Sequence, residues 1–162
     1  MSLLPGDEAP DFYLMSVNSN NDNKAEKVTL SSFKGRKVLL FFFPTSLDGV
    51  LSPTEFYQLE DLLRESKDVN CEIIGISTDP LVSLQTFLRR RRSEAGLEDM
   101  KVILASDPLG LVGKIYKIYK DGEHKNFKAV VLVDEERKIM LFEKSDFPVG
   151  LNFKPIVDKI EN

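Results

Sequence analysis

The sequence predicts an α/β fold in which helices flank both faces of a mixed central β-sheet. Short runs rich in Val, Ile and Phe alternate with longer segments whose apolar residues recur at helical spacing. Such alternation is typical of parallel strands joined by helical crossovers. The polar turn at 134–137 is short, so the two apolar runs that it joins are expected to form an antiparallel hairpin. Together these features predict a mixed sheet.

Five of the apolar runs are expected to be strands, because they are rich in β-branched and aromatic residues. Two of them, at 38–43 and 73–76, are apolar almost without interruption, as in central strands that are covered on both faces. A polar stretch at 18–24 is expected to be an exposed loop. The predicted strands are 38–43, 72–77, 102–105, 129–133 and 139–142.

Four segments are expected to be helices. The second begins with Asp79 as N-cap and Pro80 at its first position, and Gly96 is placed to end it. The first begins at Pro53, where proline is tolerated because the amide it lacks has no helical partner. The predicted helices are 53–66, 80–95, 109–119 and a last one that begins at 155.

Length and composition indicate one domain over 1–162, since 42% hydrophobic and 30% charged residues are typical of a globular chain. The longest apolar stretch, 38–44, is too short to span a bilayer. The N-terminus lacks a basic segment followed by an apolar one, so a cytoplasmic location is expected.

The net charge of -4 argues against nucleic acid and anionic membranes as partners. Residues 89–92, all arginine, are a local exception. On a helix they point around the axis in steps of about 100°, so a solvated helix end is favoured over an anion or partner site. No metal-ligand spacing and no glycine-rich phosphate loop occur, so neither a metal nor another cofactor is expected.

The single cysteine, Cys71, excludes an intramolecular disulfide and a Cys-x-x-Cys pair. A thioredoxin-like disulfide reductase is therefore disfavoured. Cys71 begins a predicted strand, and a small, partly buried strand residue is favoured over a redox role.

Five separated motifs occur in order along the chain. They are PGDEAPDF at 5–12, LSSFKGRKV at 30–38, PTEF at 53–56, IGISTD at 74–79 and SDPLG at 106–110. Together they resemble the peroxiredoxins, the AhpC/TSA family of antioxidant proteins. The resemblance implies one peroxiredoxin-like domain over 1–162 with a thioredoxin-like fold, and an oxidoreductase that reduces peroxides through a cysteine thiolate.

The resemblance places Ser52 at the position of the peroxidatic cysteine. A helix N-terminus there would lower the pKa of a thiol, but serine cannot supply a thiolate. The residues alone suggest a capping box, in which Ser52 caps the helix and Glu55 reaches back. A serine-hydrolase role is disfavoured, because the only histidine, His124, lies in a predicted loop.

The family motif Pro-x-x-x-Thr/Ser-x-x-Cys is not restored in either alignment. Counting back from Ser52 places Thr45 at the proline position, and counting forward from Pro44 places Leu51 at the cysteine. The loop is therefore expected to be one residue longer than in the family. Lys128 stands at the position of the family arginine and lacks its planar fork of donors. Glu55 is expected either to cap the helix or to pair with Lys128, and both alternatives stay open.

The catalytic-site candidates are thus Ser52, Pro44, Glu55 and Lys128. Several departures at one site favour a divergent peroxiredoxin-like protein that lacks the peroxidatic thiol and binds a protein partner or small ligand at the former peroxide pocket. The alternative is an active peroxiredoxin, reducing hydrogen peroxide or alkyl hydroperoxides, whose cysteine was engineered to Ser52. Activity would require an external thiol reductant, and the family resemblance leaves a homodimer open.

Overall fold

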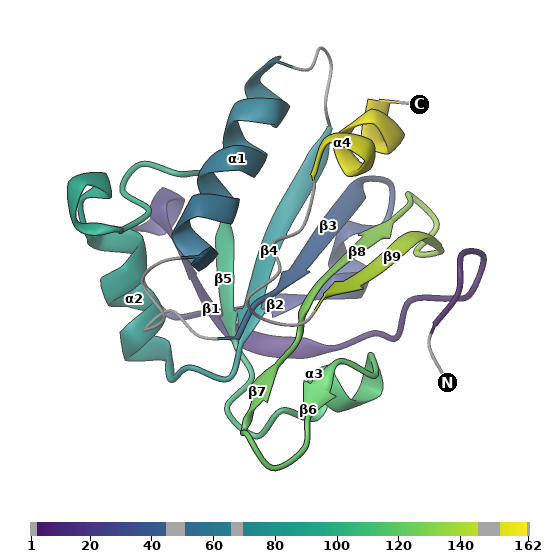
Figure 1. Cartoon of the computed structure of the whole chain (residues 1–162), viewed down its shortest axis with the longest axis horizontal. Coiled ribbons are helices and arrows are strands. Elements are labelled where there is room, and N and C mark those ends of the chain that lie inside the picture. The colour runs from purple at the N-terminus through teal and green to yellow at the C-terminus, as the bar shows by residue number, and fades with distance from the viewer. Residues whose placement is uncertain (1–2, 45–50, 66–69, 146–152, 162) are drawn as a thin grey trace.

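A mixed β-sheet of seven strands, in the order β2-β1-β5-β4-β3-β8-β9, forms the centre of the molecule (Figure 1). The computed structural model describes residues 3–44, 51–65, 70–145 and 153–161. The sheet strands are β1 (Tyr13–Asn18), β2 (Glu26–Thr29), β3 (Lys37–Phe42), β4 (Cys71–Ser77), β5 (Ile103–Ser106), β8 (Lys128–Val133) and β9 (Ile139–Ser145), and β6 (Tyr119–Lys120) and β7 (Lys125–Asn126) form a separate hairpin.

The three central strands β5, β4 and β3 run parallel, β8 pairs antiparallel with β3, and β9 pairs antiparallel with β8. The short polar turn at 134–137 joins β8 to β9, as the sequence predicts. The helices are α1 (Leu51–Glu65), α2 (Leu81–Arg89), α3 (Leu111–Ile115) and α4 (Lys154–Glu161), with 3₁₀ turns at Ser19–Asn21, Leu30–Phe33 and Arg92–Glu94. The predicted mixed sheet is therefore confirmed.

Alternate side chains of β3 pack into two hydrophobic cores, one on each face of the sheet. Leu39 and Phe41 pack with residues of α1, α2 and α4, whereas Leu40 and Phe42 pack with residues of α3 and the N-terminal segment. All four are 0% exposed. This pattern follows from the period of two in a strand, and it confirms that helices cover both faces.

The second predicted helix ends earlier than expected. α2 stops at Arg89, and Asp79 is not its N-cap, because Pro80 holds that position and the Asp79 carboxylate accepts a hydrogen bond from Ser77 Oγ at 2.6 Å. Gly96 serves a different purpose from the predicted one. A Cβ at Gly96 would lie 2.0 Å from the carbonyl oxygen of Arg90, so only glycine allows the chain to fold back this closely.

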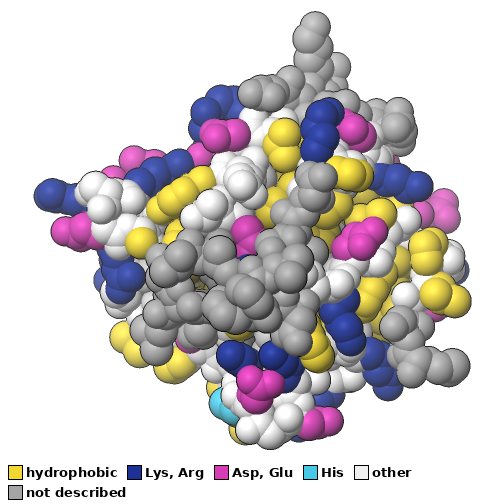
Figure 2. All heavy atoms as spheres, viewed as in Figure 1, with side chains coloured by type: hydrophobic (Ala, Val, Ile, Leu, Met, Phe, Trp, Pro, Cys, Tyr) yellow, Lys and Arg dark blue, Asp and Glu magenta, His cyan; other side chains and the backbone are white. Residues whose placement is uncertain are grey.

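Residues 30–33 form a 3₁₀ turn, and the polar stretch at 18–24, expected to be an exposed loop or wide turn, contains another. The helix predicted over 109–119 is shorter, because α3 ends at Ile115 and Lys117 adopts a φ of 63°. On the face in Figure 2, the described charged side chains of both signs are interspersed, so this part of the surface carries no single-sign field.

Candidate functional site

The candidate site lies at the carboxyl edge of β3, where α1 and β8 both begin. The chain leaves β3 at Phe42, passes the buried Pro44 and enters α1 at Leu51. Phe42 is paired with Ala129 in the antiparallel ladder, so Lys128, at the start of β8, lies beside the end of β3. The fold thus brings Pro44, the first turn of α1 and Lys128 to one edge of the sheet.

Ser52 lies within the first turn of α1. The helix begins at Leu51, two residues earlier than predicted, so the expectation that Ser52 is the N-cap is wrong. The Ser52 side chain and residues 45–50, which include Thr45, lie outside the described residues. The assignment of Ser52 to the peroxidatic position therefore stays a prediction. His124 lies in the β6–β7 turn with its Nδ1 2.9 Å from the hydroxyl of Tyr119.

Glu55 and Lys128 form a buried ion pair. Lys128 Nζ lies 2.8 Å from Glu55 Oε1, and the two side chains are 0% and 4% exposed, respectively. Of the two alternatives for Glu55, pairing with Lys128 is therefore confirmed. In such a dry environment each charge is stabilised by its partner, so removing either one is expected to be costly. The roles of these residues, and of Pro44, in chemistry or binding stay predictions.

An aromatic cluster holds the first turns of α1 against the sheet beside this pair. Phe56 packs edge-on against Phe41, with ring centroids 5.0 Å apart, and against Phe43, at 5.4 Å. All three side chains are 0% exposed. Phe56 follows Glu55 in sequence, so the packing that orders this turn also fixes the carboxylate toward Lys128.

Cys71 is the first residue of β4 and lies at the opposite end of the parallel strands from the candidate site. The parallel ladder pairs Lys37 with Cys71 at one end and Phe42 with Ile76 at the other. Five strand steps separate these ends, or about 16 Å. Burial raises the pKa of the Cys71 thiol to about 12, so the thiol is protonated at neutral pH. Its intermediate exposure agrees with the expected partly buried strand residue.

One of the four consecutive arginines is not a solvated helix end, which corrects the sequence expectation for this segment. Arg92 lies beyond α2 and donates two hydrogen bonds to Glu60 of α1, at 2.6 and 2.9 Å. Its guanidinium also lies over the ring of Tyr57, whose hydroxyl donates to the carbonyl of Gly96. Sequence reasoning missed Glu60, because no local pattern links residues that are 32 positions apart.

This pair makes stability depend on pH. The hydrogen bond from Arg92 is the largest cause that lowers the pKa of Glu60. The contribution of Glu60 to stability is then fully present above the pKa of an unfolded glutamate, about 4.3, and is lost as pH falls through the lowered folded value. We expect Glu60→Gln to lower the urea midpoint at neutral pH, and the difference from the parent protein to shrink in acid.

The control for this experiment is Asp61→Asn on the same helix. The Asp61 side chain is 66% exposed and lies 3.4 Å from Arg64, so its loss should change the midpoint little at either pH. An equal effect of Glu60→Gln at neutral and acid pH would contradict the electrostatic explanation.

Within the described residues, no helix combines the length and the apolar character of a membrane span. The same residues contain no group of three or more His, Cys, Asp or Glu side chains arranged to hold a metal ion.

Comparisons with known proteins place this geometry in a family. Residues 5–142 match the AhpC/TSA family. Peroxiredoxin-1 of Gallus gallus is 32% identical over 145 residues, which cover 90% of this chain and 71% of that protein. Thioredoxin peroxidase of Trypanosoma brucei rhodesiense is 31% identical over 144 residues, with 89% and 71% covered.

Among solved structures, the reduced 2-Cys peroxiredoxin of Plasmodium vivax superposes with a TM-score of 0.85 at 26% identity, covering 97% of this chain and 80% of that one. The mitochondrial 2-Cys peroxiredoxin of Plasmodium falciparum gives the same TM-score at 24% identity, with 98% and 92% covered. The chain therefore belongs to the AhpC/TSA family, the peroxiredoxins, and has their thioredoxin fold.

Proposed function

We propose that this chain is a divergent peroxiredoxin that lacks peroxidase activity and acts by binding a protein partner or small ligand at the edge formed by Pro44, the first turn of α1 and Lys128. The observation that carries the proposal is the position of Cys71. It is the only cysteine of the sequence, and it lies at the opposite edge of the sheet from the start of α1.

The state of the Cys71 thiol supports the same conclusion. Peroxide reduction begins with attack by a thiolate, which becomes a sulfenic acid. With a pKa of about 12, Cys71 would be ionised to only about one part in 10⁵ at neutral pH. Partial burial of Cys71 adds a steric obstacle to the low thiolate fraction.

The Glu55–Lys128 ion pair is a second support. In the family the arginine at this position stabilises the peroxide oxygens with a planar fork of donors. Here the cation at that position is an ammonium, 0% exposed and 2.8 Å from a carboxylate. An ammonium group that is already paired with Glu55 is a poor replacement for the bidentate guanidinium donor.

The experiment is a peroxide-consumption assay on the purified chain. Hydrogen peroxide and an alkyl hydroperoxide are each supplied with dithiothreitol, or with thioredoxin, thioredoxin reductase and NADPH. We expect no loss of peroxide beyond that of the protein-free mixture, because the chain supplies no thiolate at the start of α1. Cys71→Ser, the matched control, should behave like the parent.

Sustained turnover by the parent chain would contradict the proposal. If that turnover disappeared in Cys71→Ser, Cys71 would be the peroxidatic residue. A cysteine codon at position 52 of the natural gene would instead favour the alternative, an active peroxiredoxin with an engineered serine. A cytoplasmic location, a single domain and a homodimer stay predictions from the sequence.

A further inference from the structure

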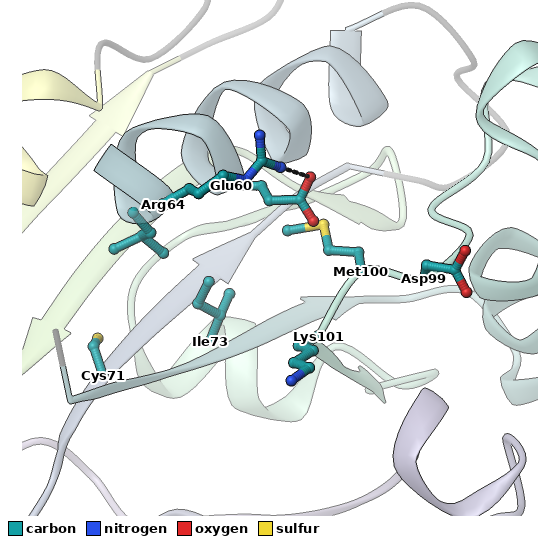
Figure 3. Close-up of a pocket in the computed structure, with 8 residues that line it drawn as sticks. Glu60, Arg64, Cys71, Ile73, Asp99, Met100 and Lys101 are labelled. Carbon is teal, nitrogen blue, oxygen red and sulfur yellow. Dashed lines mark hydrogen bonds and ion pairs between the residues drawn. The ribbon is translucent and has the colours of Figure 1, made fainter. Parts of the chain in front are cut away.

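A cavity of about 380 Å³ opens at the edge of the sheet that lies opposite the candidate site (Figure 3). It is bounded by the second half of α1, the start of β4 and the segment 99–101 that leads into β5. Its volume lies within the range of small-molecule pockets, about 300–1,000 Å³. We propose that this cavity binds a small amphiphile with an apolar body and one anionic head group.

The apolar wall of the cavity would hold the body of the ligand. Leu63 of α1, Ile73 of β4 and Met100 form this wall, and Ile73 and Met100 are 6% and 1% exposed. Methionine adapts its shape to irregular partners, because its thioether chain is unbranched and flexible. Cys71 closes one end of the wall as a neutral thiol, so no charge interrupts the apolar surface.

The acidic groups of the rim offer little to a cationic ligand. The Glu60 carboxylate already accepts two hydrogen bonds from Arg92, at 2.6 and 2.9 Å, and one from Arg64, at 3.2 Å. In Figure 3 the Asp99 carboxylate points away from the part of the cavity that Cys71 and Ile73 line. Asp99, the remaining acid, therefore lies apart from Cys71 and Ile73.

The head group is assigned to Lys101. This residue lines the cavity and is exposed, and its ammonium group has no ion pair with another residue in ranges 3–44, 51–65, 70–145 and 153–161. An anionic head beside the apolar wall would give Lys101 a charged partner at the cavity rim. The cavity thus combines an apolar wall with an uncompensated cation, the pairing that a carboxylate or sulfonate amphiphile requires.

This site is separate from the one in the proposed function. Cys71 lies at one end of the parallel strands and the start of α1 lies at the other, and the paired segment of β3 between these ends is about 16 Å long. The inference does not depend on the loss of peroxidase activity, and neither experiment decides the other.

The probe is anilinonaphthalene sulfonate, an aromatic amphiphile whose fluorescence rises in apolar surroundings. N-phenylnaphthylamine, which has the same body without the sulfonate, is the matched neutral probe. We expect saturable binding of the sulfonate at one site. Lys101→Met should weaken sulfonate binding about five-fold and leave the neutral probe unaffected, because one exposed charge pair is lost. Lys117→Met, beyond α3 on the other face of the sheet, is the control and should change neither affinity.

Cys71 reports whether the probe occupies this cavity rather than another apolar surface. As the chain's only thiol, it reacts with N-ethylmaleimide without background from other cysteines. Saturating sulfonate should slow this reaction at least about five-fold, the change scaling with occupancy of the cavity. An unchanged rate would place the probe elsewhere and overturn the proposal. Absence of saturable binding, or equal weakening by Lys101→Met and Lys117→Met, would overturn it as well.

Discussion

Lys128→Met is expected to lower the free energy of unfolding by about 3–5 kcal/mol. The Lys128 ammonium is 0% exposed and lies 2.8 Å from the Glu55 carboxylate, which is 4% exposed. Methionine fills much of the same volume but leaves the carboxylate buried without its counter-charge. Urea unfolding at neutral pH, followed by circular dichroism, measures the loss.

The double variant Glu55→Leu with Lys128→Met is the control for cavity and packing effects. Replacing both charges with apolar groups of similar volume is often neutral or stabilising, so the double variant should regain most of the stability that the single variant loses. The electrostatic account would fail if the single variant lost less than about 1 kcal/mol, or if the double variant were no more stable than the single one.

Ser52→Cys, made in a Cys71→Ser background, is expected to create a thiol that is alkylated at least about a hundredfold faster than Cys71 in the parent chain. Residue 52 lies in the first turn of α1, where the partial positive charge of the helix favours a thiolate. Cys71 has the opposite environment, since burial raises its pKa to about 12. Alkylation by iodoacetamide, followed by intact mass, gives both rates.

Adding Lys128→Arg to that variant should still give a poor peroxidase. The sequence restores the family's proline-to-cysteine spacing in neither alignment, because Ser52 and Pro44 imply different registers. A reactive thiol would then lack the surrounding donors that position a peroxide. Full peroxidase activity in this variant would show that the extra loop residue has no effect.

The strands from β5 to β9 in the sheet could be predicted from the sequence, whereas β1 and β2 on the other side could not. β3 and β4 are buried on both faces, so their residues read as unbroken apolar runs. β1 was missed because its outward-facing residues hide the alternation of a half-buried strand. The apolar residues Tyr13 and Met15 are 69% and 44% exposed, whereas the polar Ser16 is buried, so apolar and polar residues do not mark the two faces of the strand.

One ion pair beside α1 could be predicted from the sequence and another could not. The family resemblance suggested a contact between Glu55 and Lys128, which lie 73 positions apart and which no local pattern links, and the structure confirms the contact. Neither the family resemblance nor a local pattern predicted the Arg92–Glu60 pair. The chain after α2 folds back so that Gly96 lies against the backbone of Arg90, and close backbone contacts of this kind leave no periodic pattern in the sequence.

Helix ends were the least predictable feature. Asp79 and Pro80 together resemble an N-cap followed by a first helical residue, but Ser77 holds the Asp79 side chain by a hydrogen bond and shifts the boundary by one position. The start of α1 moved in the other direction, to Leu51. Shifts of this size are common, because several local hydrogen-bond arrangements compete at each helix end.

The most direct test of the central claim is the reaction of Cys71 itself with hydrogen peroxide. The folded chain is treated with stoichiometric peroxide in the presence of dimedone, which traps sulfenic acid, and intact mass is followed against time. The account predicts that the folded chain is labelled no faster than the same chain unfolded in urea, because its only thiol is partly buried and protonated. Rapid, stoichiometric labelling of the folded chain would contradict it.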